Sequence, residues 1–332
     1  MKTARIGIFK IKNSLEQTVE ETLNALNWKQ HIRGRVFLKP NLCSPIYVAG
    51  AVTNPELLYY LIKAIREHVE EVIVGESDGY YYSSEEAFEK TGISKAVEMA
   101  GGKIVNLSRD KTVEIGNSNS LHLKKVRLPK TLVEADSIVS VPVMKTHEFT
   151  LYSGAIKNLF GCLPSDRRIL FHPHINEVLS DLMLILRPSF AVMDATVAME
   201  GNGPGRGIPV KMGLVLASND LLALDKTAAE IMCIDWTTIQ HLKLISEVTQ
   251  AEGINSSVTE EKIEEVKRPF VAPYMDFPVK AQLRIYKSLP LTYLCFNTPV
   301  FKVVNGAAKI YRAINLKIKG EELTRKHWSK PN

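Results

Sequence analysis

The sequence lacks the features that mark a membrane-spanning, secreted or disulfide-stapled protein. No apolar run reaches the roughly 18 to 20 residues of a membrane span, and the apolar part of the leading MKTARIGIFKIKNS is too short for a secretory signal. Cysteine is scarce, and no CxxC pair is present, which argues against a zinc ribbon or a locally built ferredoxin-type cluster. The four cysteines are Cys43, Cys162, Cys233 and Cys295. We therefore expect a cytoplasmic protein with reduced thiols and no local iron–sulfur motif.

Acidic residues are few in the C-terminal part of the chain. The chain as a whole has a net charge of +6, but Lys267–Asn332 contains thirteen Lys or Arg against three Asp or Glu, a net charge of +10 that leaves −4 for the rest. A basic stretch of this kind is most often a solvated face; otherwise it docks an acidic partner or places the protein peripherally at a membrane surface. No nucleic-acid-binding motif is present, so we expect no nucleic-acid partner.

Apolar segments alternate with amphipathic ones along most of the chain, which is typical of an α/β layered fold. Because the strand segments are apolar on both faces, we predict a mainly parallel sheet with helices on both faces. The predicted strands are Arg5–Phe9, Val36–Lys39, Glu71–Gly75, Lys103–Leu107, Ser137–Val143, Phe190–Asp194 and Met212–Ala217. The predicted helices are Ser14–Leu26, Pro55–His68, Glu85–Gly92, Ile93–Ala100, Asn176–Leu186 and Leu221–Met232.

Two segments depart from this alternation. Thr112–Pro129 alternates apolar and polar residues around Gly116, which predicts a hairpin at an edge of the sheet. Composition shifts to basic and aromatic after Glu252–Glu265, so we predict an α/β domain over residues 1–252 and a basic, helical C-terminal region over residues 253–332. Within that region Leu289–Leu316 favours a docked helical hairpin, with binding at a membrane interface as the alternative.

Polar side chains gather where predicted strands end, and the carboxyl ends of strands are where open α/β sheets bind ligands. A cation and an amide follow Val36–Leu38, a lysine and a histidine follow Ser137–Val143, and a second lysine and an amide open a helix near Ser153. Two lysines and a histidine near one strand end would bind a carboxylate or phosphate. The candidate catalytic residues are Lys145, His147 and Lys157, and the candidate substrate-binding residues here are Lys39, Asn41 and Asn158.

Two further loops carry polar groups. Gly75–Gly79 is an acidic, glycine-flanked loop that suits either a plain turn or a contact with a metal or a substrate amine. The stretch Asp194–Gly207, DATVAMEGNGPGRG, has glycines that let a ligand approach the backbone, although it matches neither GxGxxG nor GxxxxGKS/T. Its candidate substrate-binding residues are Asn202, Gly203, Gly205 and Arg206.

A divalent metal is the minority hypothesis for this region. Imidazole and carboxylate groups suit zinc, iron or nickel, although two histidines separated by one residue more often lie at a helix start. The candidate ligands are His172, His174, Asp194 and Glu200.

Taken together, these motifs resemble a known family, the domain-of-unknown-function family 362, which is often described as iron–sulfur-associated. The resemblance is carried, in the family's order over roughly residues 36–232, by VFLKPNL, VPVMKTH, SGAIKNLFG, the His172/His174 region, MDATVAMEGNGPGRG and NDLLALDKTAAEIM. It implies a domain and its pocket residues but no general reaction. Many members carry a ferredoxin-like CxxCxxCxxxCP segment, which this chain does not have, so redox chemistry here would need a separate ferredoxin-like donor.

Two functional hypotheses remain open. In the first, the protein is an enzyme in which the lysines hold a small anionic substrate and His147 or a lysine transfers a proton, as a reductase or as a proton-transfer isomerase or lyase. Asp194 and Glu200 would orient a metal or a substrate hydroxyl. In the second, the protein is a non-catalytic anion- or cofactor-binding module that docks a partner or membrane surface through its basic C-terminal region. The first is favoured because several titratable groups in one place are costly unless they are used.

Overall fold

The structure is a computed structural model that describes residues 4–79, 82–164, 168–249, 256–257, 261–275, 277–296 and 303. The chain divides into two compact units, Met1–Arg168 with His174–Tyr274, and Ile169–Pro173 with Met275–Asn332. The predicted domain boundary at residue 252 lies outside the described residues, and so does most of the predicted hairpin Leu289–Leu316.

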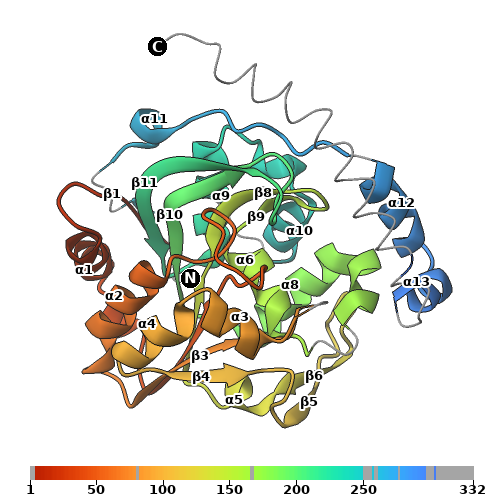
Figure 1. Ribbon diagram of the computed structural model, residues 1–332, viewed down its shortest axis with the longest axis horizontal. Coiled ribbons are helices and arrows are strands. Elements are labelled where there is room, and N and C mark those ends of the chain that lie inside the picture. The colour runs from red at the N-terminus through yellow and green to blue at the C-terminus, as the bar shows by residue number, and fades with distance from the viewer. Residues whose placement is uncertain are drawn as a thin grey trace. The chain divides into compact units, whose positions relative to one another are not determined.

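A ten-stranded mixed sheet forms the centre of the larger unit (Figure 1). Eight strands follow the order β12-β1-β11-β10-β7-β2-β3-β4, with β8 and β9 attached beside β10. Neighbours from β10 through β4 run parallel, whereas β11 is antiparallel to both β10 and β1. The strands are β1 Arg5–Lys10, β2 Arg35–Pro40, β3 Glu71–Glu76, β4 Lys103–Asn106, β7 Ser137–Val141, β8 Val143–His147, β9 Leu151–Ser153, β10 Phe190–Glu200, β11 Ile208–Ser218 and β12 Ser256–Ser257.

Helices cover the sheet in two groups, as the sequence predicted for an α/β layered fold (Figure 1). Helices α1, α2 and α4 pack beside one another, and α6, α8, α9 and α10 form the second group. The helices of this unit are α1 Leu15–Ala25, α2 Pro55–Arg66, α3 Ser84–Lys90, α4 Ile93–Met99, α5 Lys130–Val133, α6 Ala155–Asn158, α8 Ile175–Leu186, α9 Leu221–Ile231, α10 Gln240–Thr249 and α11 Ile263–Val266. The predicted fold class is therefore confirmed.

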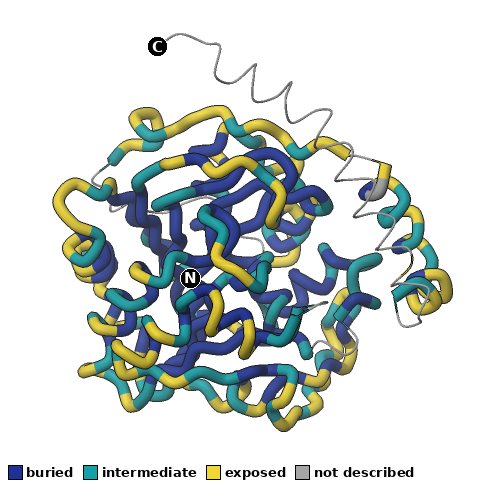
Figure 2. Tube along the Cα trace, in the orientation of Figure 1, coloured by how far each residue is buried: buried dark blue, intermediate teal, exposed yellow. Residues whose placement is uncertain are grey.

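Helix α2 illustrates how local sequence builds this layer. The Asn54 side chain caps it by accepting from the Glu56 backbone N–H at 2.9 Å, and Pro55 occupies its first turn, where no backbone donor is needed. Its apolar residues recur at helical spacing, so Leu57 and Leu61 are fully buried against the sheet. Figure 2 shows that the central strands are mostly buried and that the helices carry exposed residues, as expected for a sheet covered on both faces.

The segment after β7 corrects one prediction. Regular structure was expected to end at Val143, with polar residues in the loop beyond. Instead the strand is interrupted at Pro142 and a second strand, β8, follows. β7 pairs with β2, whereas β8 pairs with β10 and β9. Lys145 and His147 therefore lie in a strand, because pairing with two further strands satisfies their backbone groups.

The predicted hairpin is present but lies elsewhere. Strands β5 Thr112–Gly116 and β6 Lys125–Pro129 pair antiparallel, from Thr112 opposite Pro129 to Gly116 opposite Lys125. They form a separate two-stranded sheet and do not extend the edge of the main one.

In the smaller unit, α12 Phe277–Tyr286 and α13 Leu289–Phe296 are joined by a short turn. The Thr292 hydroxyl donates to the Ile285 carbonyl at 3.0 Å, and the rings of Tyr286 and Phe296 lie 5.5 Å apart. Large apolar side chains of this unit are exposed, among them Phe277, Leu289, Leu291 and Tyr293.

One stretch among the described residues, Ile169–Leu186, is long and apolar enough to cross a membrane by length and composition alone. This is weak evidence, because the core helix of a soluble protein passes the same test. Within it the buried Asp181 carboxylate accepts from the backbone N–H groups of Leu121, His122 and Leu123 at 2.6–2.8 Å. Such a carboxylate packs α8 against the chain near β6.

Candidate functional site

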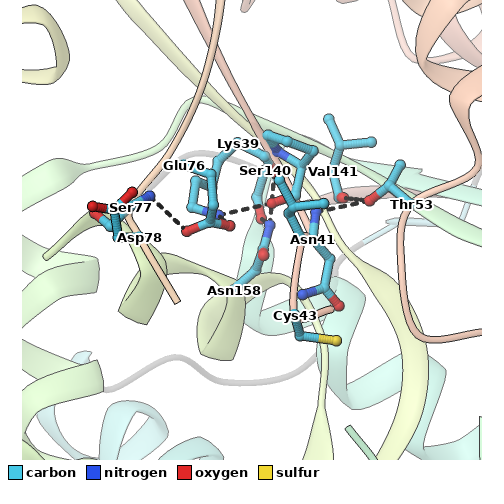
Figure 3. A network of polar contacts seen from close by, with 12 residues as sticks. Lys39, Asn41, Cys43, Thr53, Glu76, Ser77, Asp78, Ser140, Val141 and Asn158 are labelled. Atoms are coloured by element: carbon cyan, nitrogen blue, oxygen red, sulfur yellow. Dashed lines mark hydrogen bonds and ion pairs between the residues drawn. The ribbon is translucent and has the colours of Figure 1, made fainter. Parts of the chain in front are cut away.

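A buried ion pair marks the carboxyl ends of β2 and β3. Lys39 is fully buried, and its Nζ donates to the Pro40 carbonyl at 2.7 Å and pairs with the Glu76 carboxylate. Glu76 also accepts from the Ser77 backbone N–H at 3.0 Å. Figure 3 shows the two side chains turned toward each other across the strand ends. The charge of Lys39 is therefore balanced within the protein.

Helix α6 is joined to these strands by an amide. Asn158 donates from Nδ2 to the Lys39 carbonyl at 2.7 Å and to the Ser140 hydroxyl at 3.2 Å (Figure 3). Ser140 in turn donates to the Ala155 carbonyl at 3.0 Å. Asn158, predicted to bind substrate, thus fixes α6 against β2 and β7.

Lys145 on β8 reaches the loop that follows β2. Its Nζ donates to the Asn41 side-chain oxygen, to the Ala51 carbonyl at 2.7 Å and toward the Cys43 sulfur at 3.5 Å. Lys145 is 1 % exposed, and this burial lowers the pKa of its ammonium. The loop is held in turn because Asn41 donates from its backbone N–H to Thr53 Oγ1 at 2.8 Å.

Lys157 on α6 differs from the other two lysines. It is partly buried, and among the described residues its Nζ has no hydrogen-bond or ion-pair partner; it lies over the Phe160 ring at 5.0 Å from the centroid. Burial, followed by the charges of Lys145 and Arg168, lowers its pKa to about 7. A lysine with this pKa exchanges its proton near neutrality. We call Lys39, Lys145 and Lys157, with Asn41 and Asn158, the lysine cluster.

A carboxylate beneath α6 fixes the position of Lys157. Asp225 on α9 is fully buried and accepts from the backbone N–H groups of Ala155 at 2.7 Å and Ile156 at 2.9 Å, and from the Tyr152 hydroxyl at 2.9 Å. These donors include the first free N–H groups of α6, so Asp225 acts as a cap supplied from another helix. Burial raises the pKa of Asp225 to about 7 although all three hydrogen bonds oppose this shift.

The glycine-rich loop contacts protein groups along its length. The Asn202 side chain exchanges two hydrogen bonds with the Tyr274 backbone at 2.8 and 2.9 Å. Arg206 pairs with the Glu148 carboxylate, and the Gly203 carbonyl accepts from the Glu148 backbone N–H at 3.0 Å. Of the predicted substrate-binding residues, Asn202, Gly203 and Arg206 therefore join this loop to neighbouring segments, whereas a Cβ at Gly205 would meet nothing within 4 Å.

His147 lies beside this loop at the end of β8. It is buried, and its Nδ1 accepts from the Phe149 backbone N–H at 3.1 Å. Its predicted catalytic role stays a prediction.

The four predicted metal ligands have other partners. Asp194 accepts from the backbone N–H groups of Asn54 and Thr196 at 2.8 and 3.0 Å, and Glu200 accepts from the Val271 backbone N–H at 3.1 Å. The rings of His172 and His174 stack on Tyr286 and His122, with centroids 5.0 and 4.4 Å apart. Across the part of the chain that the structure describes, no three His, Cys, Asp or Glu residues form a group that could hold a metal ion. Each of the four residues thus contacts protein groups of its own, and the metal site stays a prediction.

Sequence reasoning missed several residues that contact or influence the lysine cluster. Glu76 was placed in an acidic loop, but it is the last residue of β3 and the counterion of Lys39. Cys43 follows Asn41 by two residues, and that proximity was the available signal. Asp225 was left open between a buried charge and a helix-terminal residue, and Arg168, whose charge lowers the pKa of Lys157, gave no signal.

These observations define an α/β protein with a lysine cluster near the end of β2, to which β8 and α6 also contribute residues. The chain matches the family "Domain of unknown function (DUF362)" over residues 36–230, more than half of its length, and so belongs to that family. The predicted resemblance is confirmed.

Similar proteins were found by sequence and by structure. The chain is 28% identical over 213 residues to the "Thylakoid-associated protein sll1697" of Synechocystis sp., covering 62% of this chain and 65% of that relative, and thus spans about two thirds of its length. The lactate racemase apoprotein of Thermoanaerobacterium thermosaccharolyticum aligns with a TM-score of 0.41 and 17% identity over 63% of this chain and 53% of that one. A Thermotoga maritima protein aligns with a TM-score of 0.35 and 13% identity over 71% and 59%.

Proposed function

We propose that this protein is an enzyme that binds a small carboxylate or phosphate at the lysine cluster and uses Lys157 to transfer a proton. The observation that carries the proposal is Lys157 itself: a partly buried ammonium without a hydrogen-bond or ion-pair partner among the described residues, with a pKa lowered to about 7 chiefly by burial. An unpaired charge at such a position is costly, and a bound anion would offset the cost.

The neighbouring charges support an anionic ligand. Lys39 is neutralised by Glu76, so it contributes little net attraction. Lys145 and Arg168 both act on Lys157 as like charges, and the Arg168 guanidinium donates to the Asp78 carbonyl at 2.6 Å, a neutral partner. The local excess of positive charge therefore favours a carboxylate or phosphate.

Proton transfer is the chemistry that suits this amine best. An amine with a pKa near the working pH is present in both protonation states, which is the condition for a general acid or base. A positive neighbour and a bound anion change that pKa in opposite directions, so ligand binding would switch Lys157 toward its ammonium form. This supports an isomerase or lyase over a purely binding role.

The experiment is a titration of Lys157 by NMR on the full chain carrying ¹³C-labelled lysine, with and without inorganic phosphate or acetate. We expect a pKa of about 7 that rises when either anion binds. Lys157→Met should weaken anion binding at least tenfold in calorimetry. The matched control is Lys226→Met, since Lys226 also lies over an aromatic ring, 4.0 Å from the Trp236 centroid, with a pKa lowered by burial. An unchanged Lys157 resonance at saturating phosphate and acetate would overturn the proposal.

A second function, docking at an anionic membrane surface, is favoured by the smaller unit. Phe277 on α12 is 70% exposed and Tyr293 on α13 58%, and the exposed cations of this unit include Lys280 and Arg284 on α12 and Lys287 in the turn that follows it. Exposed apolar side chains beside basic ones suit the headgroup region of an anionic bilayer. The association of a relative with thylakoids agrees with this proposal.

Flotation of the full chain with vesicles tests this docking. We expect binding to vesicles that contain roughly 30% phosphatidylglycerol and little binding to phosphatidylcholine alone, because polybasic segments bind anionic surfaces. A triple change of Lys280, Arg284 and Lys287 to Glu should abolish it. The same change at the exposed Lys95, Lys124 and Lys243 of the larger unit serves as the charge-matched control. Equal binding by both triple variants would contradict the proposal.

The remaining predicted partners, a ferredoxin-like donor and an acidic protein, stay predictions. A non-catalytic role for the lysine cluster stays the alternative to proton transfer.

A further inference from the structure

Cys43 lies inside the lysine cluster, and the proposed function gives it no role. Its sulfur is 3.5 Å from Lys145 Nζ, 3.1 Å from the Ala51 carbonyl and 3.5 Å from the Pro204 carbonyl. The residue is half-buried, so part of it remains exposed to solvent. The Cys43 side chain extends from the same loop as that of Asn41 (Figure 3).

The partners of Lys145 make the thiol chemically distinctive. Lys145 is buried, and its other hydrogen-bond acceptors, the Asn41 amide oxygen and the Ala51 carbonyl, are neutral. Among the hydrogen-bond partners of Lys145 in the described residues, Cys43 alone can ionise. Transfer of the thiol proton to the Lys145 amine would therefore create a thiolate–ammonium ion pair between Cys43 and Lys145, in which each charge balances the other.

Lys157 belongs to the same electrostatic environment. The charges of both Lys145 and Cys43 act on Lys157, so the thiol lies within range of the amine that the proposed function uses. The cluster thus holds a thiol, a buried amine beside it and a second amine that exchanges its proton near neutrality. Nucleophile, base and acid are the three groups that addition to a carbonyl requires.

We propose that Cys43 is a nucleophilic thiol, with Lys145 as its proton acceptor, that adds to the aldehyde or ketone carbon of a small substrate that also carries a carboxylate. The thiol proton passes to Lys145 Nζ, the sulfur forms a bond to the carbonyl carbon, and the carbonyl π electron pair moves to oxygen. The Lys157 ammonium protonates that oxygen, which gives a thiohemiacetal with no leaving group and no change of oxidation state. The choice of a carboxylate rests on the proposed function, whereas the reactivity of the thiol does not.

The other cysteines supply internal standards for a test on the unmodified chain. Cys233 is exposed and measures an ordinary accessible thiol. Cys162 is buried, and burial raises its pKa to about 12, so it measures an inert thiol. Alkylation by iodoacetamide at pH 6.5, quantified per cysteine by mass spectrometry, compares all of them in one sample.

We expect Cys43 to react about tenfold faster than Cys233 at pH 6.5 despite its lower exposure, because thiolate is the reacting form. Lys145→Met should bring the rate of Cys43 to or below that of Cys233. Should this variant fail to fold, the relative rates of Cys43, Cys233 and Cys162 in the unmodified chain decide. A Cys43 rate equal to or below that of Cys233 would overturn the inference.

Addition to a carbonyl is tested by protection. Glyoxylate, which has a carboxylate and an aldehyde, should protect Cys43 but not Cys233 from iodoacetamide, while acetate should not protect. Equal protection by acetate and glyoxylate would support anion binding and overturn carbonyl addition. A borohydride-trapped glyoxylate adduct on Lys157 would also overturn it, because the amine would then be the nucleophile. Absence of phosphate and acetate binding with retained Cys43 reactivity would instead reject the proposed function and leave the thiol's activation standing.

Discussion

Lys39 and Glu76 form a buried ion pair that links the ends of two parallel strands, β2 and β3. Lys39 is fully buried and Glu76 is 5% exposed, and they lie 37 positions apart in the chain. Gly161 closes over them, since a Cβ there would overlap the Glu76 carboxylate and lie 2.9 Å from Lys39 Nζ. The charge of Lys39 is therefore balanced by Glu76, whereas no ion-pair partner is seen for Lys145 or Lys157 among the described residues.

Removing one member of this pair is expected to be severe. Glu76→Gln should lower the free energy of unfolding by about 3 to 5 kcal/mol, because Lys39 would keep a buried charge without a counterion. Urea denaturation followed by circular dichroism measures this change. The control is Glu86→Gln, which breaks the exposed pair with Lys90 and should cost less than about 0.5 kcal/mol.

The double variant Lys39→Met with Glu76→Gln sharpens the comparison. Because no charge remains buried, it should be more stable than Glu76→Gln alone. A double variant that loses as much stability as the two single changes added together would show that the residues do not act as a pair.

Two glycines of one loop should respond differently to alanine. A Cβ at Gly203 would overlap the Thr146 carbonyl, a backbone atom that cannot swing away, whereas a Cβ at Gly205 would meet nothing within 4 Å. We expect Gly203→Ala to lower the free energy of unfolding by roughly 2 kcal/mol or more and Gly205→Ala to change it by less than about 0.5 kcal/mol. Thermal melts of the two variants provide the measurement, and equal melting temperatures would contradict the close approach at Gly203.

Asp225 should affect both stability and ligand binding. Asp225→Ala removes the acceptor of three hydrogen bonds and leaves two α6 backbone donors without a partner, which should cost about 2 to 4 kcal/mol. Because α6 carries Lys157, phosphate affinity measured by calorimetry should fall at temperatures where the variant remains folded. We also expect Asp225→Ala to change the measured pKa of Lys157, and this change would identify Asp225 as a positioning residue.

The control for Asp225 lies at the start of the same helix. Asp220 caps α9 by accepting from the Ala223 backbone N–H at 2.8 Å. Asp220→Ala should cost about 1 kcal/mol, as for an ordinary N-cap, and leave phosphate affinity unchanged. If both variants lost affinity equally, general loosening of α9 would explain the result.

Lys157 should produce a defined dependence of stability on pH. Its pKa is lowered from 10.5 to about 7 on folding, so between these values the unfolded chain binds more protons than the folded one. The contribution of Lys157 to stability therefore rises as pH increases from about 7 to about 10.5, and its destabilising effect is complete below pH 7.

Replacing the side chain should remove this dependence. At pH 6, Lys157→Met is expected to raise the free energy of unfolding by roughly 2 kcal/mol, a value reduced from the full shift because the side chain is only partly buried. Above pH 10.5 the two proteins should differ little. Urea titrations at a series of pH values measure the difference, and a constant difference across the series would mean that Lys157 keeps its ordinary pKa in the folded protein.

Local patterns in the sequence were sufficient for most of the elements. Ser14 accepts from the Gln17 backbone N–H at 3.1 Å as the N-cap of α1, at the predicted start of that helix. β2 was predicted from a continuous apolar run and is buried along its length. Such signals are readable because caps and buried strands depend on residues within a few positions of one another.

Contacts across the sheet were beyond the reach of those patterns. The sequence predicted a polar loop where β8 lies. These residues form a strand only because they pair with β10, which is some fifty positions away in the chain. Similarly, His172 and His174 are separated by one residue in the sequence, yet their rings stack on different partners, which the sequence pattern did not indicate. Adjacency in the chain fixes the spacing of backbone atoms and leaves the direction of each side chain to packing.

The sequence by itself determined that this is an α/β protein of its family and that lysine and amide side chains emerge near strand ends, because hydrophobic periodicity and local motifs encode both. The tertiary structure alone decided the state of each lysine. Glu76 neutralises Lys39, the loop at Asn41 receives Lys145 across 104 positions, and Lys157 has no hydrogen-bond or ion-pair partner among the described residues and lies over the Phe160 ring. These outcomes depend on strand order and on burial. The desolvation cost that shifts the pKa of a buried charge arises only in the packed chain, so the sequence pattern does not reveal it.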